Sequence, residues 1–127
     1  MSKAVLDASA MLAMIFDEPG AEALTDEILD RAVASTVNLA EVQSKLIKKG
    51  YDPEVAWEHT SMLADAEIFT PEQAKIAGTM IAKTERMGLS LGDRSCLALA
   101  ISLKAEVYTT ERLWKGLKVG VPIHVLR

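Results

Sequence analysis

The sequence predicts an α/β fold, a single domain over residues 1–127 with a central parallel sheet of about five short strands. Short apolar runs alternate along the chain with longer segments of helical periodicity. Short apolar strands separated by helices form parallel sheets that helices cover on both faces. Half of the residues are hydrophobic and a quarter are charged, which is ordinary for one globular core of this size.

The expected elements follow from apolar pattern, caps and stops. Strands are expected at residues 3–7, 32–35, 67–69, 106–109 and 122–126. Helices are expected at 9–16, from 19 through 29, at 38–49, from 53 through 63, at 71–87 and at 92–104. Pro19 and Pro71 suit first helical turns, and Gly50 suits a helix end.

Composition restricts where the protein works. The longest strictly apolar run, Ala10 to Phe16, is too short to span a membrane, and the N-terminus does not resemble a signal peptide. A single cysteine, Cys96, permits no internal disulfide. A cytoplasmic protein with no membrane partner is therefore expected.

The net charge of −4 is unevenly distributed. Residues 1–82 carry 14 acids and 6 bases, whereas residues 83–127 carry 4 acids and 8 bases. A basic C-terminal part can form a face for phosphate groups, although solvated surface lysines explain the same pattern.

Four acids stand where apolar runs end or begin: Asp7, Glu41, Asp93 and Glu111. The carboxyl ends of parallel strands form the binding crevice of open α/β sheets, so these side chains are expected to converge. Oxygen ligands without a cysteine or histidine cluster suit Mg²⁺ or Mn²⁺ rather than zinc. His59 and His124 have no second ligand at a useful spacing.

Each acid also has a purely structural explanation. Asp7 suits the N-cap of the following helix. Glu41, three residues after Asn38, has the spacing of a capping box, and Asp93 stands in the same relation to Ser90. Glu111 can be a solvated turn residue.

The strings AVLDASAMLAMIFDEPGAEAL, STVNLAEVQSKL, LSLGDRSCLALAISLKAEVYTTERLW and the final IHVLR resemble PIN-domain ribonucleases, specifically the VapC-type toxins of toxin–antitoxin pairs. The resemblance extends over essentially the whole chain. It implies a PIN-like nuclease domain, a metal-dependent endoribonuclease activity on RNA, and a small antitoxin partner that occupies the active-site groove.

By this resemblance, Asp7, Glu41 and Asp93 match three acids of the family pattern. The fourth acidic position, usually Asp, falls on Glu111, which is a departure from the pattern. Thr110 beside it matches a hydroxyl position near the family's metal site.

Other residues next to these acids are candidates for substrate binding. Ser9 suits a hydrogen bond to a carboxylate or a substrate phosphate, or a helix cap. Arg94 and Arg112 each adjoin a predicted ligand and suit RNA phosphates, although a surface arginine is an equal explanation.

Two further sets of apolar residues have more than one possible location. Trp57, Met62 and Leu63 suit either the core or a homodimer face. Trp114 suits burial against the last strand more than stacking on a base.

Three functions are compatible with an α/β fold of this kind. The first is the metal-dependent endoribonuclease toxin. The second is a catalytically inactive PIN-fold module that binds RNA or protein. The third is another doubly wound class, but a phosphatase usually has an acid where Ser9 stands, and a receiver needs an acidic pair that is missing here. No nucleotide-binding glycine motif occurs.

Overall fold

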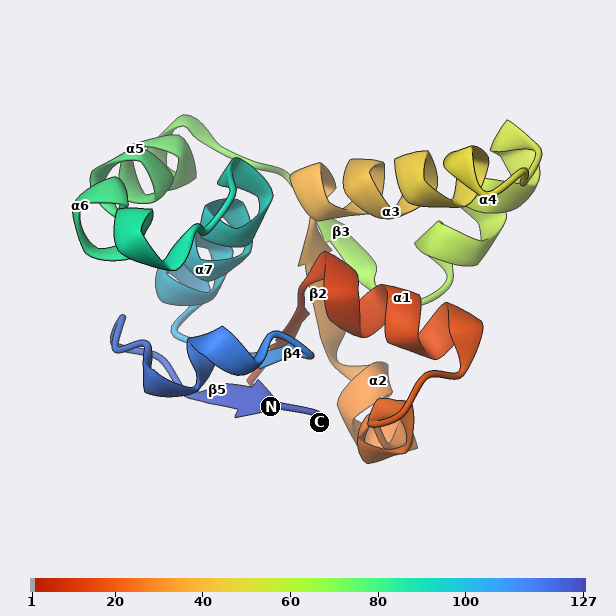
Figure 1. The fold of residues 1–127 in the computed structure, drawn as a ribbon, viewed down its shortest axis with the longest axis horizontal. Helices are drawn as coiled ribbons and strands as arrows, with labels where there is room; N and C mark the ends of the chain where they lie inside the picture. Colours follow the sequence, from red (N-terminus) through yellow and green to blue (C-terminus); the bar gives the residue numbers. More distant parts are fainter. Residues whose placement is uncertain (1) are drawn as a thin grey trace.

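The computed structural model describes residues 2–127 and, within them, one five-stranded parallel sheet. The strands are β1 (Ala4–Leu6), β2 (Ala32–Ser35), β3 (Asp65–Glu67), β4 (Glu106–Thr109) and β5 (Ile123–Val125). They lie in the order β3-β2-β1-β4-β5, with the first strand in the middle (Figure 1). The predicted α/β fold with a parallel sheet of five strands is confirmed.

Helices cover both faces of this sheet. They are α1 (Ala8–Phe16), α2 (Asp26–Asp30), α3 (Thr36–Lys48), α4 (Pro53–Ser61), α5 (Pro71–Thr79), α6 (Ile81–Thr84), α7 (Leu91–Leu103), and the 3₁₀ turns η1 (Ala21–Ala23), η2 (Glu85–Met87) and η3 (Arg112–Gly116). Successive strand residues face opposite sides. Ala4 and Leu6 pack with α1, α3 and α4, whereas Val5 packs with α7 on the other face (Figure 1). Within residues 2–127, no helix is both long and apolar enough to cross a membrane.

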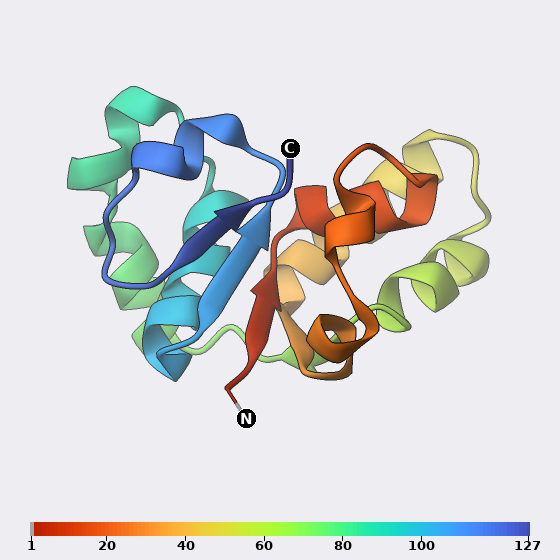
Figure 2. The same cartoon turned by 90° about the horizontal axis from the view of Figure 1, so that it is seen from below.

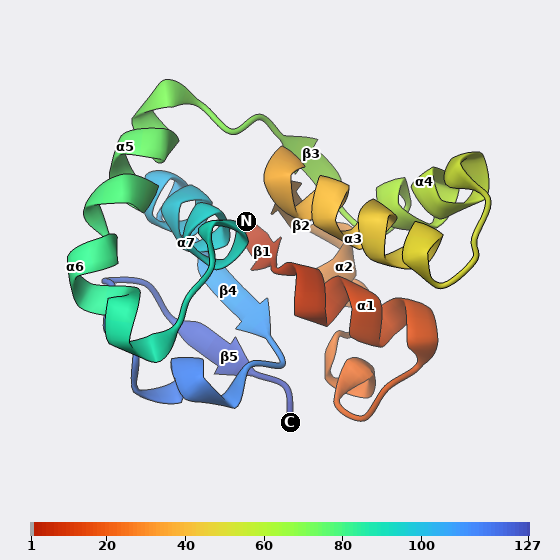
Figure 3. The ribbon, with the colours of Figure 1, turned by 45° about the horizontal axis from the view of Figure 1, so that its top comes forward.

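The carboxyl ends of the strands lie at one edge because all neighbouring pairs are parallel (Figure 2). Two helices begin at this edge with almost no intervening loop. A single residue, Asp7, separates β1 from α1, and α3 follows β2 directly. Both helices then run away from the sheet side by side (Figure 3). This arrangement places α1 next to the end of β4, and α3 next to α7.

The segment from Pro19 to Leu29 differs from the expected single helix. It forms the short turn η1 and then α2. Gly20 adopts a φ of +95°, and a Cβ there would lie 2.6 Å from the Leu126 carbonyl oxygen. Thr25 is extended and caps α2 by accepting a hydrogen bond from the Ile28 N–H at 3.4 Å. The close approach of the C-terminal residues at Gly20 and the Thr25 cap therefore break the helix that apolar spacing suggested.

The third strand is also displaced from its predicted position at residues 67–69. It spans Asp65–Glu67 and lies at the edge of the sheet. Ile68, one of the apolar residues that suggested the strand, lies just after it and is 74% exposed. Acidic side chains on a short edge strand protect the sheet from further pairing. The prediction was wrong because it assumed that every strand is apolar and buried.

The helix expected over residues 71–87 is interrupted at Met80. Thr70 caps its start by accepting from the Gln73 N–H at 3.1 Å, but α5 ends at Thr79 and is followed by α6 and η2. The Thr79 and Thr84 hydroxyls each donate to the carbonyl four residues earlier, a bond that bends helices.

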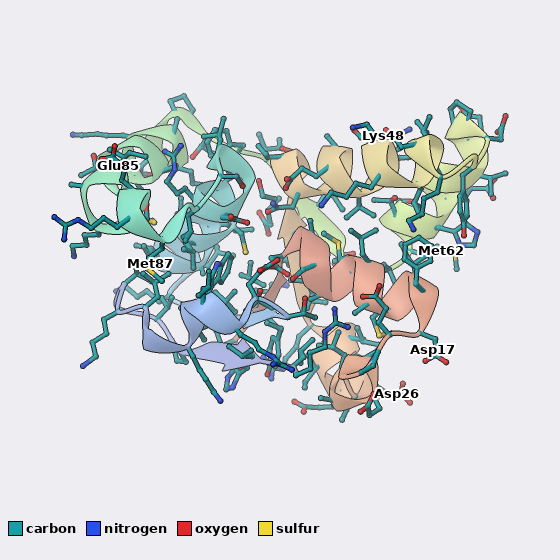
Figure 4. All side chains as sticks on the ribbon, viewed as in Figure 1. Asp17, Asp26, Lys48, Met62, Glu85 and Met87 are labelled. Atoms are coloured by element: carbon teal, nitrogen blue, oxygen red, sulfur yellow. The ribbon has the colours of Figure 1, made fainter. Side chains whose placement is uncertain are left out.

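Some of the large apolar side chains are buried and others are exposed to solvent. Trp114 is buried in η3, which packs against β5, as expected. Trp57 on α4 is 42% exposed, and Met62, just after that helix, is 82% exposed (Figure 4). Leu63 is partly buried against the core.

Candidate functional site

Asp7 is the most constrained acid at the carboxyl edge of the sheet. It is 2% exposed and is the N-cap of α1, where its Oδ1 accepts from the Ala10 N–H at 2.8 Å. The Ser9 hydroxyl donates to the same oxygen at 2.7 Å, and the Thr109 hydroxyl donates to Oδ2 at 2.6 Å. The structural explanation of Asp7 as a cap is therefore correct, and three donors also fix the orientation of its carboxylate.

The charge of Asp7 is poorly compensated. Burial raises its pKa to about 6, although the hydrogen bonds from Thr109, Ser9 and Ala10 act in the opposite direction. The nearby negative charge of Asp93 raises this pKa further. Perturbed carboxylates of this kind are concentrated at functional sites, because structural acids are usually paired with a cation.

Glu41 lies on α3 and faces the start of α7. The Asn38 side-chain amide donates to Glu41 Oε1 at 2.7 Å and to the Gly92 carbonyl at 3.0 Å. A Cβ on Gly92 would overlap the Glu41 carboxylate, so only glycine permits this approach. The capping explanation for Glu41 is wrong, because α3 begins earlier than expected and Ser35 caps it by accepting from the Val37 N–H at 3.2 Å.

Asp93 lies in the first turn of α7 and has a structural role there. Its Oδ2 accepts from the Ser90 N–H at 2.9 Å, and its own N–H donates to the Ser90 hydroxyl at 3.1 Å. This is the capping box that the sequence suggested. Its negative charge nevertheless acts on Asp7, so the capping role and a functional role are compatible.

The charges of all three acids act on the thiol of Cys96. This buried thiol lies one turn after Asp93, and burial raises its pKa well above the ordinary value. Asp7, Asp93 and Glu41 each raise it further by their negative charges. Contacts within the protein bring two of these acids close, since the Glu41 carboxylate lies against Gly92, the residue before Asp93. Asp7 follows β1, Glu41 lies on α3 and Asp93 on α7, and all three charges act on the same buried thiol.

The remaining predicted residues occupy different surroundings. Glu111 follows β4 and is exposed, and the Thr110 N–H beside it donates to the Ser9 hydroxyl at 2.9 Å. Arg112 is exposed and donates to the Arg127 carbonyl at 3.3 Å. Arg94 is turned away from the acids and donates to the Ala77 carbonyl of α5 at 2.9 Å. The position of Arg94 therefore gives its predicted contact with substrate no support.

A hollow of about 420 Å³ adjoins this edge of the sheet. Its walls come from α1, α3 and the residues after β4, and one end contains Ser9, Thr110 and Glu111. Three lysines of α3 line it as well: Lys45, Lys48 and Lys49. Sequence reasoning did not identify these lysines, because it looked for positive charge only in the C-terminal part of the chain.

The donor atoms at the site are those that a hard divalent cation prefers, since Asp7, Glu41, Asp93 and Thr109 offer only oxygen. Asn38 Oδ1 is buried without a hydrogen-bond partner, which adds one unused acceptor beside Glu41. Within residues 2–127, however, no three acidic, histidine or cysteine side chains form a ready-made metal-ligating group. The residues fit such a cation by chemistry and charge, because they offer only oxygen atoms and because three donors hold the Asp7 carboxylate in one orientation.

Two residues of the site were missed from sequence. Thr109 is fully buried and holds Asp7, whereas the hydroxyls expected near the acids were those of Ser9, which does bond Asp7, and Thr110. Parallel pairing of Leu6 with Tyr108 places Thr109 beside Asp7, and that register was the available signal. Asn38 was considered only as a helix cap.

Comparison with known proteins identifies the family. A model of the PIN domain matches residues 4–116 of the chain. No curated protein sequence matches it.

Solved structures with the same fold are distant in sequence. The DNA-bound VapBC of Salmonella typhimurium is 20% identical with a TM-score of 0.78, and the match covers 100% of both chains. VapBC2 of Rickettsia felis, bound to a promoter fragment, is 17% identical with a TM-score of 0.75 over 98% of each chain. The sarcin–ricin-loop-cleaving toxin VapC20 of Mycobacterium tuberculosis is 15% identical with a TM-score of 0.67, over 94% of this chain and 99% of that one.

Proposed function

The chain belongs to the PIN-domain family, and from this premise we propose that it is a metal-dependent endoribonuclease, the toxin of a toxin–antitoxin pair. The proposal extends the PIN-like domain over residues 1–127. The observation that carries it is the buried Asp7 carboxylate, whose pKa is raised by burial and by the charge of Asp93. Glu41 is packed against Gly92, the residue before Asp93, which brings a third acid to the start of α7.

Mg²⁺ or Mn²⁺ bound by Asp7, Asp93 and Glu41, with Glu111 as a fourth and more distant ligand, would supply a water of lowered pKa and neutralise charge on the phosphoryl oxygens. The chain's own residues prepare the acids for this task. Thr109 and Ser9 hold the Asp7 carboxylate in one orientation, and Asn38 holds Glu41 against Gly92. No side-chain nucleophile is needed in such a reaction.

The partners and location follow from the same proposal. An RNA strand is the substrate, and a small antitoxin is the partner, as the VapBC names of the structural neighbours suggest. Of the predicted substrate contacts, Ser9 and Thr110 are supported by the hydrogen bonds that connect them with Asp7. Arg112 contacts the Arg127 carbonyl, and Arg94 is the least supported. A homodimer and a cytoplasmic location stay predictions.

Purified protein incubated with RNA tests this function directly. Cleavage is expected with Mg²⁺ or Mn²⁺ and not with a chelator. Asp7→Asn or Asp93→Asn should slow it by about a thousandfold, because several kcal/mol of transition-state stabilisation is lost. Asp65→Asn, on the exposed edge strand, is the matched control and should leave the rate unchanged. Cleavage that survives both chelator and Asp7→Asn would disprove the proposal.

Expression in cells provides an independent test. Growth arrest by the parent protein is expected, with relief by Asp93→Asn and by the cognate antitoxin. Arrest that Asp93→Asn does not relieve would indicate toxicity without nuclease activity.

A catalytically inactive PIN-fold binding module is the second candidate. Its support is that residues 2–127 contain no ready-made group of metal ligands. RNA binding without cleavage at any divalent cation concentration would favour this alternative.

A further inference from the structure

The hollow beside the acids is a groove between two helices. Ser9, Leu12 and Phe16 line it from α1, and Lys45, Lys48 and Lys49 line it from α3. Both helices begin at the acidic edge of the sheet and run away from it side by side (Figure 3). The groove therefore has an inner end at the acids and an outer end at Phe16 and Lys49.

The lysines continue the helix face that carries Glu41. Residues four and seven positions apart lie on the same side of an α-helix, so Lys45 and Lys48 follow Glu41 in one row and Lys49 flanks them. At a rise of 1.5 Å per residue, Lys45 stands about 6 Å and Lys49 about 12 Å along the axis from Glu41. A polymer with its reacting phosphate at the acids would thus meet positive charge at successive positions outward.

The charge of this groove is complementary to a nucleic-acid backbone. Four cationic residues line it, the three lysines and Arg127, against the two carboxylates Glu18 and Glu111. Arg127 is paired with Glu18 at 3.2 Å. Among the ion pairs of residues 2–127, none involves the three exposed lysines, so no carboxylate of these residues neutralises their charge.

The opposite wall offers an aromatic surface. Phe16 is partly buried at the end of α1, and the Lys49 ammonium lies 4.9 Å from the centre of its ring. Grooves that hold single strands combine cations for the backbone with aromatic rings for the bases. A hollow of about 420 Å³ has the size of a small-ligand pocket, which suits one or two nucleotides and excludes a duplex.

We propose that this groove between α1 and α3 binds the single-stranded RNA flanking the cleavage point. Lys45, Lys48 and Lys49 hold backbone phosphates, and Phe16 contacts a base. The assignment rests on the proposed nuclease function, because that function puts the reacting phosphate at the acids.

Binding can be measured apart from cleavage. A short, fluorescently labelled single-stranded RNA is titrated with the full-length protein in chelator, and anisotropy is followed across a series of salt concentrations. Single strands give a slope of about −0.7 in log affinity against log salt for each neutralised phosphate. The triple variant K45Q/K48Q/K49Q should therefore lower the magnitude of the slope by about 2 and weaken binding at low salt.

Three comparison variants separate charge from folding. K3Q/K75Q/K83Q removes three exposed lysines away from the groove and should retain the parent slope. K45R/K48R/K49R keeps the charges and should retain most of the slope. Phe16→Leu should weaken RNA binding roughly fivefold or more but leave the slope unchanged, because a stacking contact releases no counterions. Circular dichroism and thermal unfolding establish that each variant is folded.

The outcomes distinguish this proposal from the proposed function. If K45Q/K48Q/K49Q is folded and has the same slope and affinity as K3Q/K75Q/K83Q, the RNA groove is disproved and the lysines are left to a protein partner. If the parent binds RNA with the predicted lysine dependence but never cleaves it, RNA binding by the groove is supported and the nuclease function, with its cleavage point, fails.

Discussion

Two carboxylates, one at the amino ends of the strands and one at their carboxyl ends, have opposite electrostatic surroundings. Glu106 opens β4 and accepts from Arg31 Nη1 at 2.9 Å and from the Tyr108 hydroxyl at 2.8 Å, and it lies 2.8 Å from His124 Nε2. Burial opposes its ionisation, but the bonds from Tyr108 and Arg31 and the charges of Arg31 and His124 lower its pKa below the ordinary value. Asp7, after β1, has only hydroxyl and amide donors, and burial raises its pKa to about 6.

The difference separates an acid that stabilises the fold from one that does not. Glu106 is held by the Arg31 guanidinium, a cation that the chain itself supplies, so its charge contributes to the folded state. Asp7 lacks such a partner within residues 2–127, and its charge is unfavourable to the folded protein. Sites that keep a strained or uncompensated group are commonly those where an external ligand supplies the missing interaction.

The largest expected effect is on Asp7 in the metal-free protein. Its pKa in the folded state lies above the ordinary 3.8, so the folded state binds this proton more tightly than the unfolded state. The stabilisation is complete below pH 4 and is lost as the pH rises through about 6. Asp7→Asn should therefore raise the free energy of unfolding at pH 7.5, by about 3 kcal/mol at most.

Urea unfolding in chelator at pH 7.5 and pH 4 measures this effect. The gain should be present at pH 7.5 and small at pH 4, while Asp65→Asn on the exposed edge strand should change neither value. A variant that is less stable than the parent at pH 7.5 would show that the hydrogen bonds of Asp7 outweigh its burial.

Gly92→Ala tests the packing of the acids. An alanine Cβ would overlap the Glu41 carboxylate and displace it from the Asn38 amide. We expect metal affinity and cleavage to fall ten- to a hundredfold, as for other changes to the orientation of a ligand. Gly78→Ala is the matched control, because nothing lies within 4 Å of its Cβ. It should stabilise α5 by about 0.5–1 kcal/mol without changing activity.

Isothermal titration with Mn²⁺ and the rate of RNA cleavage give the two readouts for the glycine variants. Equal affinities in Gly92→Ala and Gly78→Ala would mean that Glu41 does not contribute to metal binding.

Thr109→Val removes the hydroxyl that orients Asp7 Oδ2 while keeping the shape of a fully buried side chain. We expect cleavage to slow about tenfold. The loss of this hydrogen bond should also raise the pKa of Asp7 further, because that bond lowers it in the parent. The pH above which metal binds should therefore be higher in Thr109→Val than in the parent. Thr109→Ser keeps the hydroxyl and should bind metal over the same pH range as the parent.

The core strands could be predicted because local signals coincide there, whereas the roles of the acids beside them stay predictions. The buried strands β1, β2 and β4 are short apolar runs, and Asp7 directly follows β1. Glu41 lies in the second turn of α3, the helix that follows β2, and Asp93 lies in the first turn of α7. The same reasoning failed at β3, an exposed edge strand with two acids, and at residues 19–29, where contact with Leu126 decides the backbone at Gly20. Those features depend on distant parts of the chain.

Side-chain partners were harder to predict than positions. Asp93 is next to Arg94 in sequence, but the helix turns Arg94 toward α5 and away from the acids. Lys45, Lys48 and Lys49 belong to a segment with excess negative charge, yet the fold gathers them in one groove. Local charge balance therefore gave no indication of the positive wall beside the site.

The smallest expected effect is on Glu106, the compensated acid. Its pKa is lowered in the folded state, so its stabilising contribution is present above the ordinary value and is lost as the pH falls through the lowered one. Glu106→Gln should reduce the free energy of unfolding at pH 7.5 by about 1 kcal/mol, the usual range for a partly exposed ion pair. Glu106 lies at the amino ends of the strands, whereas Asp7 lies at their carboxyl ends, so RNA cleavage should be unchanged. Urea unfolding and the cleavage rate of the same preparation measure both quantities. If Glu106→Gln instead made the protein more stable, as Asp7→Asn should, Glu106 would not be a stabilising acid and the contrast with Asp7 would be wrong.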